Sequence, residues 1–128
     1  MALTVDRSAV LAGARLAVIV AVPAILLGQA LESAAGGDAV IPLYLVILGG
    51  QCAGGRLAAL RQPLSPLTHG ALAAIASYMA LVAVIVAIQL ALGREVTDPV
   101  SLVFNGLMAA SAGMFGGYLA ARRMAADE

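Results

Sequence analysis

The chain has 128 residues, of which 62% are hydrophobic and only 11% are charged, and its formal net charge at pH 7 is zero. A mean hydropathy of +1.02 is far above that of a soluble domain of this length and is typical of membrane proteins. The balanced charge offers no basic surface to nucleic acid, so nucleic acid is excluded as a partner. We therefore expect one transmembrane domain over residues 1–128, with the lipid bilayer as its surroundings.

Four intervals without charged residues predict four membrane-spanning helices. The intervals are 16–31, 39–55, 62–93 and 99–121. A hydrocarbon core of about 30 Å takes about 20 helical residues, so the last two intervals are long enough alone. The first two become long enough if the flanking arginines lie near the interface. The expected fold is an all-α polytopic membrane protein with helices at about 9–31, 39–60, 68–92 and 99–122.

Residues typical of turns and helix ends separate these intervals. The segment 32–38 combines glycines with acidic residues, and Asp38 is placed to cap the start of the second helix. Gly93 is expected to stop the third helix. Asp98 followed by Pro99 predicts the start of the fourth.

The second half of the chain repeats features of the first half at an offset of 62 residues. The offset aligns two glycine–alanine–arginine segments: Gly54, Gly55, Ala58, Ala59 and Arg61 with Gly116, Gly117, Ala120, Ala121 and Arg123. We predict two helical hairpins, at about 7–61 and 69–123, joined by a hinge at 62–68. Because each unit spans the membrane twice, both copies face the same way and form parallel repeats about an axis along the membrane normal.

Small residues at four-residue spacing predict where the helices pack. In lipid, small side chains let two backbones approach closely, and this close packing drives helix association. We predict a central contact between the second and fourth helices through one set of packing residues: Gly50, Gly54, Ala58, Ala109, Gly113, Gly117 and Ala121. A second stripe on the fourth helix holds Ala112, Gly116 and Ala120. With two such faces, one is free to bind a further copy of the chain or a larger membrane complex.

The arginines indicate the orientation in the membrane. Six of the seven fall on the side that holds both termini and the hinge, and only Arg94 falls on the other side. This bias predicts a multi-pass protein of the plasma membrane with both termini in the cytoplasm. No acidic residue matches Arg15 or Arg56 in depth, so we interpret these two as snorkelling side chains rather than parts of an ion pathway. The predicted topology anchors are Arg15, Arg56, Arg61, Arg122 and Arg123.

A few polar residues lie at intermediate depth in the predicted helices. Gln51, Ser77 and Ser111, with Tyr78 beside them, form a candidate polar patch in the inner half of the bundle. Hydrogen bonding between helices is the commoner role of such residues, and coordination of a solute is the alternative. Pro23 predicts a kink in the first helix, which either fits the bundle or marks a substrate pathway.

Other polar and aromatic residues fall toward the helix ends. We expect water or lipid headgroups to satisfy the outer amides Gln29, Gln89 and Asn105. The expected interfacial anchors are Tyr44, Phe104 and Tyr118.

The chain carries no recognisable catalytic motif. It has no nucleophile elbow, no phosphate-binding loop and no dinucleotide fingerprint, and its glycine pairs fall inside membrane helices. The single histidine, His69, rules out a metal site built from several histidines, and the single Cys52 is interpreted as a small packing residue. We predict no enzyme activity, no metal and no cofactor.

Three segments of the chain carry a resemblance to known proteins. They are GGQCAGGRLAALRQP at 49–63, THGALAAIASY at 68–78 and FNGLMAASAGMFGGYLAARR at 104–123. These segments resemble small four-helix bacterial integral membrane proteins of unassigned function that contain a glycine-rich duplicated helical hairpin. The resemblance covers nearly the whole chain and implies the fold, but it supplies no catalytic residues.

Two functions are compatible with the sequence. The first is a structural or accessory membrane protein that packs against itself or a larger membrane complex through its glycine faces. The alternative is a small oligomeric transporter or channel for a solute, with Pro23, Gln51, Ser77 and Ser111 near the pathway. A dry bundle core would favour the first function, and a solvent-reachable cavity lined by these residues would favour the second.

Overall fold

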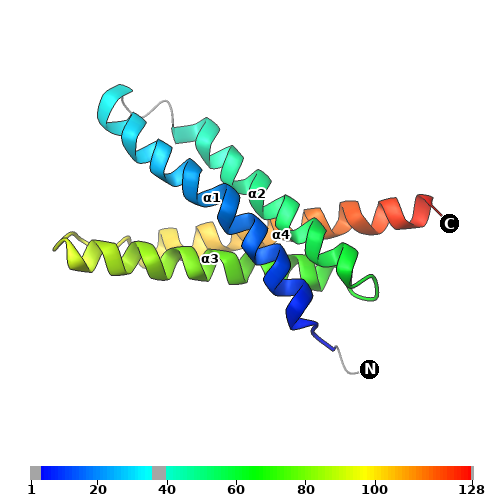
Figure 1. The fold of residues 1–128 in the computed structure, drawn as a ribbon. Coiled ribbons are helices and arrows are strands. Elements are labelled where there is room, and N and C mark those ends of the chain that lie inside the picture. The colour runs from blue at the N-terminus through cyan, green and yellow to red at the C-terminus, as the bar shows by residue number, and fades with distance from the viewer. Residues whose placement is uncertain (1–3, 36–39, 128) are drawn as a thin grey trace.

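A computed structural model describes residues 4–35 and 40–127, and every long element in these residues is an α-helix. The four helices are α1 (Arg7–Ala35), α2 (Val40–Arg61), α3 (Pro66–Ala91) and α4 (Pro99–Ala126) (Figure 1). Each contains a stretch that is long and apolar enough to cross a membrane. The prediction of an all-α fold with four helices that are long and apolar enough to span a membrane is therefore confirmed for the described residues.

The helix ends follow local cap chemistry. Asp98 caps α4, because its carboxylate accepts from the backbone N–H groups of Val100 at 2.8 Å and Ser101 at 3.2 Å. After α3, Gly93 takes a φ of +63°, a left-handed conformation that glycine adopts without strain. The expected cap at Asp38 lies outside the described residues.

The turn between α2 and α3 is shorter than the predicted hinge. The second helix continues to Arg61, and the third begins at Pro66 rather than at residue 68. Proline at the first position of a helix loses no intrahelical hydrogen bond, so Pro66 starts α3 instead of delaying it. The first helix also runs unbroken through Pro23.

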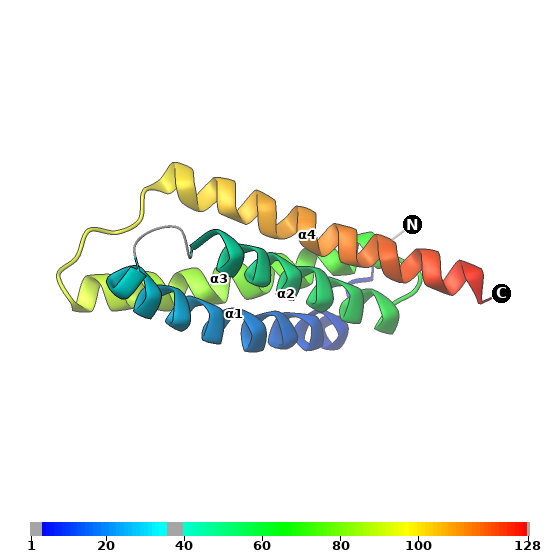
Figure 2. The same cartoon turned by 90° about the horizontal axis from the view of Figure 1, so that it is seen from above.

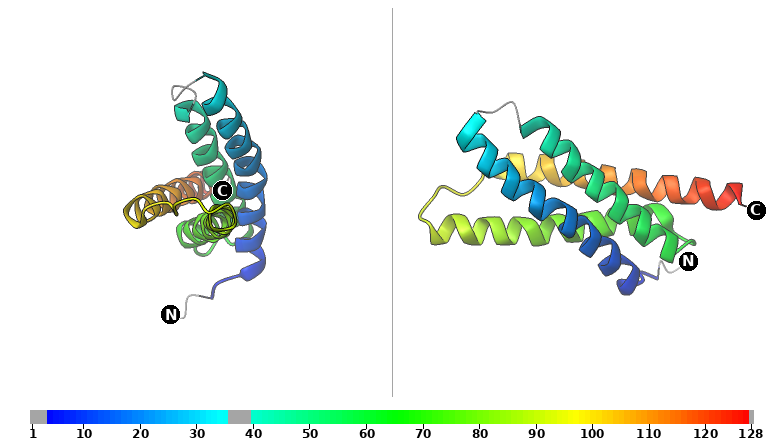
Figure 3. Two further views of the ribbon diagram at one scale, coloured as in Figure 1. Left: turned by 90° about the vertical axis from the view of Figure 1, so that its left-hand side faces the viewer. Right: turned by 45° about the horizontal axis from the view of Figure 1, so that its top comes forward.

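The four helices form two hairpins that lie across one another. Helix α1 lies beside α2, and α3 lies beside α4, as the views in Figures 1 and 3 show. Helices α2 and α3 each contact all three other helices, whereas α1 and α4 do not contact each other in the described residues. The predicted contact between α2 and α4 is present, but the centre of the bundle is shared by α2 and α3. If a two-fold axis exchanged the hairpins, the contact between α2 and α3 would be matched by one between α1 and α4, and the described residues show no such contact. The duplication stays a prediction.

Glycine backbones make the closest contacts of the bundle. We call the set Gly13, Gly54, Gly55, Gly70, Gly113 and Gly116 the glycine junction. A methyl group added at Gly13 would collide with the carbonyl oxygen of Gly54, and one at Gly55 would lie 2.7 Å from the Cα of Gly113. One at Gly116 would collide with the carbonyl oxygen of Cys52. The surrounding core consists of fully buried alanines, so the helices meet almost backbone to backbone.

The stripes of small residues meet different partners from the predicted ones. On α2, Gly50 faces Val20 and Gly54 faces Gly13, so the four-residue stripe packs on α1 within its own hairpin rather than on α4. Ala58, which is fully buried, lies against the same part of α1. The neighbouring Gly55 faces α4 instead, because consecutive helical residues point about 100° apart.

On α4 the two stripes divide in the same way. Gly113 and Gly117 face α3, where a methyl group on either would meet backbone atoms of Gly70 or Pro66. Ala109, on the same stripe, is buried and Ala121 is half-buried. Gly116 faces α2. The packing surfaces are therefore used between helices of one chain.

Both ends of the described chain lie at the end of the bundle that holds the turn between α2 and α3 (Figure 2). The outer faces carry exposed aliphatic side chains such as Ile19, Ile41 and Leu107, as a protein surrounded by lipid requires. Arg15 and Arg61 are exposed, as are Arg122 and Arg123, and Arg56 is half-buried. The side of the membrane on which the termini lie stays a prediction.

Candidate functional site

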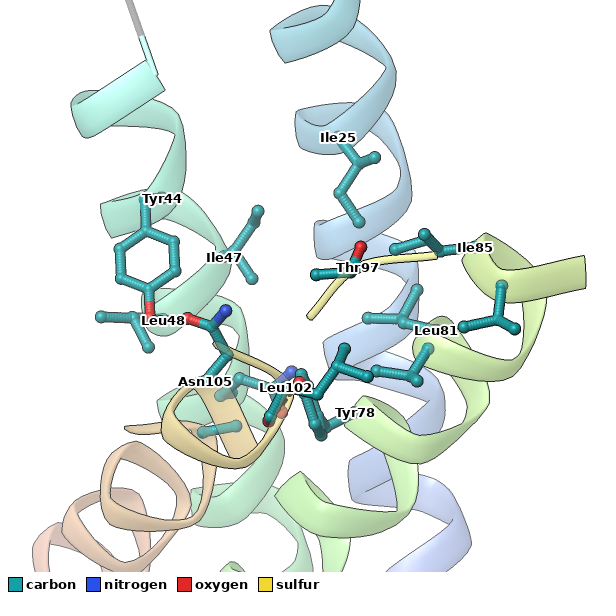
Figure 4. A pocket seen from close by; sticks show the side chains of 14 residues that line it. Ile25, Tyr44, Ile47, Leu48, Tyr78, Leu81, Ile85, Thr97, Leu102 and Asn105 are labelled. Atoms are coloured by element: carbon teal, nitrogen blue, oxygen red, sulfur yellow. Dashed lines mark hydrogen bonds between the residues drawn. The ribbon is translucent and has the colours of Figure 1, made fainter. Parts of the chain in front are cut away.

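A partly open cavity of about 270 Å³ lies between α2, α3 and α4 (Figure 4). Its lining residues come from the half of each helix that is farthest from the turn between α2 and α3. Helix α1 contributes Ile25, and the segment between α3 and α4 contributes Thr97. The apolar part of the wall includes Ile47, Leu48, Leu81, Val82, Ile85 and Leu102. Residues of both hairpins therefore line the cavity.

The glycine junction begins where the cavity ends. On α2 the lining residues end at Gln51, one turn before Gly55, and on α4 they end at Ala109, one turn before Gly113. Because a methyl group at either glycine would meet the opposite backbone, the junction leaves no room for a continuous channel. The bundle is thus hollow in one half and closely packed in the other.

Gln51 lies at the inner end of the cavity lining, and Ser77, which is not part of that lining, is its hydrogen-bond partner. The Ser77 hydroxyl lies 2.6 Å from the Oε1 atom of Gln51 and 2.9 Å from the carbonyl oxygen of Ala74. Gln51 is 1% exposed and Ser77 is 0% exposed. A buried polar side chain in a membrane helix is costly unless it finds such a partner. This hydrogen bond joins the first hairpin to the second.

Gln51 lines the cavity, and its amino group has no protein partner in the described residues. Its Oε1 atom accepts from Ser77, but its Nε2 atom makes no hydrogen bond to the described residues. Every fully buried side-chain nitrogen or oxygen atom in those residues has a partner. The unpaired Nε2 atom therefore keeps some exposed surface, and the residue that carries it lines the cavity.

Tyrosine hydroxyls hold the walls of the cavity. The Tyr44 hydroxyl donates to the Oδ1 atom of Asn105 at 3.0 Å, and the Tyr78 hydroxyl donates to the carbonyl oxygen of Leu102 at 2.7 Å. Figure 4 shows Tyr44 and Asn105 pointing toward one another from α2 and α4. These bonds fix α4 to both α2 and α3, and they leave the amino group of Asn105 without a partner in the described residues.

Thr97 carries a further hydroxyl on the lining. The Gln89 side chain donates through Nε2 to the Thr97 hydroxyl at 3.1 Å and accepts from the Thr97 backbone N–H at 3.2 Å. The side-chain amide of Gln89, which we expected water or lipid headgroups to satisfy, thus forms hydrogen bonds with Thr97. The Thr97 hydroxyl proton remains available.

The lining contains no charged residue and no histidine. The described residues also contain no cluster of three or more histidine, cysteine or acidic side chains that could hold a metal ion. Hydrogen bonds from neutral amides and hydroxyls, together with apolar contact, are what this arrangement offers a ligand. It offers no group suited to acid–base or nucleophilic chemistry at neutral pH beyond the tyrosines and the threonine.

The structure brings together two of the three residues predicted to form a polar patch. Gln51 and Ser77 bond directly, and Gln51 and Tyr78 line the cavity, whereas Ser77 does not. Ser111 lies elsewhere: it is exposed, and its hydroxyl donates to the carbonyl oxygen of Leu107 in its own helix at 2.8 Å. Pro23 is also exposed and does not line the cavity.

Two residues of the cavity were expected at the membrane surface. Tyr44 was predicted to be an interfacial anchor, and Asn105 was expected to be satisfied by water or headgroups. Each lies near the outer end of its helix, but each turns inward to meet the other. Their separation of 61 positions does not match the 62-residue offset of the repeat, and we find no feature of the sequence that pairs them. The side chain of Gln29 lies outside the described residues.

His69 belongs to the opposite end of the bundle. Its Nε2 atom accepts from the backbone N–H of Asp6 at 3.0 Å, so the ring proton is on Nδ1, which faces the Ser65 hydroxyl at 2.9 Å and carbonyl oxygen at 3.0 Å. The ring is 1% exposed. His69 therefore ties the start of α1 to the start of α3 and takes no part in the cavity.

Comparison of the chain with protein-family models, with curated proteins and with solved structures finds no match in any of the three. The functional argument accordingly rests on the geometry of this cavity. The four apolar helices of the described residues are compatible with a small membrane protein.

Proposed function

We propose that this membrane protein binds a small solute between its hairpins and serves as a small transporter or channel unit for it. The observation that carries the proposal is the unpaired amino group of Gln51 at the inner end of the cavity. The Gln51 side chain is 1% exposed, and a nearly buried hydrogen-bond donor without a partner costs stability. Its retention beside a cavity is explained if a ligand or water completes the bond.

The packing of the glycines also supports this function over a purely structural one. A scaffold that assembles through glycine faces needs those faces on its surface. Here the glycines of the junction meet backbones of the same chain. The cavity lining, which has no charged group, supports binding rather than catalysis.

The closed junction defines what transport would require. A solute that enters from the hollow half meets the Gln51–Ser77 bond and then the junction, where Gly55 contacts Gly113. Passage requires the two hairpins to move apart there, as rigid helical units do in alternating access. The separation of α1 from α4 leaves one side of the bundle free for such a rotation.

The distribution of arginine supports an orientation for this pathway. The end that holds the turn between α2 and α3 also holds the exposed Arg61, Arg122 and Arg123. We infer that this end is cytoplasmic and that the cavity lies in the outer half of the plasma membrane.

Thiol labelling tests whether the cavity contains water. In a Cys52→Ala background, Leu48→Cys places a thiol in the cavity, and Leu45→Cys places one three residues earlier on the same helix, where Leu45 is 62% exposed outside the lining. We expect a small membrane-impermeant thiol reagent to label Leu48→Cys in lipid vesicles at least about ten times faster, because reaction needs an ionised thiol in water. Equal labelling, or faster labelling of the shallower Leu45→Cys, would show that no wet cavity exists.

A structural or accessory role remains the second candidate, and one observation favours it. Gly49 and Ala53 are four residues apart on an exposed face of α2, and a methyl group added at Gly49 would meet nothing within 4 Å. Small residues at this spacing suit close approach by a helix of another chain. Gly49→Leu tests this role. If the role is correct, the unsubstituted protein is an oligomer in mild detergent and the substitution reduces its size. An unchanged size would contradict the role.

A further inference from the structure

We propose that the cavity takes an uncharged, compact molecule with an apolar body and one exposed hydrogen-bond acceptor, such as a carbonyl oxygen, which meets the amino group of Gln51. The inference rests on the proposed solute-binding function and names the chemical class of the solute. It follows from three properties of the wall, namely its donors, its lack of charge and its size.

The polar groups around the cavity have hydrogen-bond donors that remain unused. The hydroxyls of Ser77 and Tyr44 give their protons to the amide oxygens of Gln51 and Asn105. Tyr78 gives its proton to the carbonyl oxygen of Leu102. Each of these amide oxygens already accepts one hydrogen bond, whereas neither amide nitrogen donates one to the described residues, so the unused donors favour a ligand that accepts.

The lack of charge excludes ionic ligands. No charged residue lines the cavity. A carboxylate or phosphate that left water for this site would find no compensating cation, and an ammonium group would meet amide donors with the wrong polarity. A neutral acceptor satisfies the donors at the lowest desolvation cost.

The size and the apolar wall limit the body of the ligand. A volume of about 270 Å³ lies just below the range of about 300–1,000 Å³ that is typical of ligand pockets, so it suits a small molecule. Ile47, Leu48, Leu81 and Val82 make most of the wall near Gln51 apolar. A small ligand with a mostly carbon body matches this wall.

A pair of nearly isosteric probes tests the acceptor directly. Cyclohexanone carries a carbonyl oxygen, and methylenecyclohexane replaces that oxygen by CH₂ at almost the same shape. The protein is placed in nanodiscs of phosphatidylcholine and phosphatidylglycerol and labelled with ¹⁵N in its side-chain amides. The chain has only four glutamines and one asparagine, so the spectrum is simple to assign. Gln62, in the turn between α2 and α3, is the internal control.

We expect cyclohexanone to shift the amide signals of Gln51 and Asn105 saturably and to leave Gln62 unchanged. Methylenecyclohexane should bind about tenfold more weakly, because it leaves a buried donor unpaired. Gln51→Leu should remove the preference for the ketone, and the matched Gln62→Leu should keep it. We expect the fold of Gln51→Leu to be preserved, because Ser77 retains the Ala74 carbonyl oxygen as an acceptor, and an unchanged Asn105 signal in the free protein checks this.

Several results would overturn the inference. Equal binding of the two probes would show a merely apolar site, and tighter binding of chloride or of cyclohexylammonium than of the ketone would show a charged ligand. If no probe binds but Leu48→Cys is labelled, the ligand class is wrong and the solute-binding function stands. If labelling also fails, both proposals fail.

Discussion

The substitution Gly55→Ala tests the close packing of the junction. The added methyl group would lie 2.7 Å from the Cα and 2.8 Å from the carbonyl carbon of Gly113, and these backbone atoms cannot rotate away. Overpacking costs about 1–3 kcal/mol, and the upper end applies where backbone must move. Alanine gains about 1 kcal/mol over glycine in a helix. We therefore expect Gly55→Ala to lower the free energy of unfolding by about 2 kcal/mol.

Gly49→Ala is the matched control on the same helix. A methyl group there meets nothing within 4 Å, so only the helix-propensity gain remains, and stability should be unchanged or rise by up to about 1 kcal/mol. Both variants are unfolded reversibly by titration of mixed micelles with dodecyl sulfate. A fluorogenic thiol dye reports unfolding through Cys52, the single cysteine, which is half-buried at the junction.

The difference between the two variants decides the argument. We expect Gly55→Ala to be less stable than Gly49→Ala by about 3 kcal/mol. Equal stabilities would mean that α2 and α4 are not in backbone contact at Gly55, and the proposed closure of the bundle would be wrong.

Two further predictions concern hydrogen bonds at opposite depths. In a double-mutant cycle of Gln51→Leu and Ser77→Ala, we expect a coupling energy of about 0.6–1.7 kcal/mol from unfolding titrations, and a coupling near zero would show that the bond across the hairpins is not formed in the membrane. At the surface, hydrogen bonds from the Ser101 hydroxyl and from the backbone N–H groups of Val100 and Ser101 lower the pKa of Asp98 below its ordinary value of 3.8. Because this pKa is lower in the folded state, the stabilisation is fully present above about pH 4 and is lost as pH falls through the folded-state pKa. Carbon-13 titration of the carboxyl should give a midpoint below 3.8, and Asp98→Asn should reduce the pH dependence of stability below about pH 4. A midpoint at or above 3.8 would contradict the cap.

The helices could be predicted from sequence because the thickness of the bilayer fixes their length. In addition, the backbone N–H and C=O groups of a spanning segment must form hydrogen bonds within that segment. The helix ends could also be predicted where the capping chemistry is local, as at Asp98 and Gly93. The hinge was predicted too long, since Pro66 begins a helix instead of interrupting one.

The rotation of each helix about its axis could not be predicted. Sequence position gives the depth of a residue but not the neighbour it faces, and α2 has two adjacent small faces, at Gly54 and Gly55, that meet different helices. The same uncertainty separates Ser111, which lies on an outer face, from Asn105, which turns inward to Tyr44. The cavity is therefore a property of the packing, which a single sequence does not specify.

The most direct test of the account is hydrogen exchange at the two ends of the cavity. Protein in nanodiscs is transferred to deuterated buffer, and NMR follows the side-chain amide of Gln51 and the backbone amide of Gly116. A wet cavity above a closed junction predicts exchange of the Gln51 amide within minutes while Gly116 stays protected for hours or longer. Protection of both groups would show a dry bundle core, and rapid exchange of both would show an open passage, and either result would contradict the account.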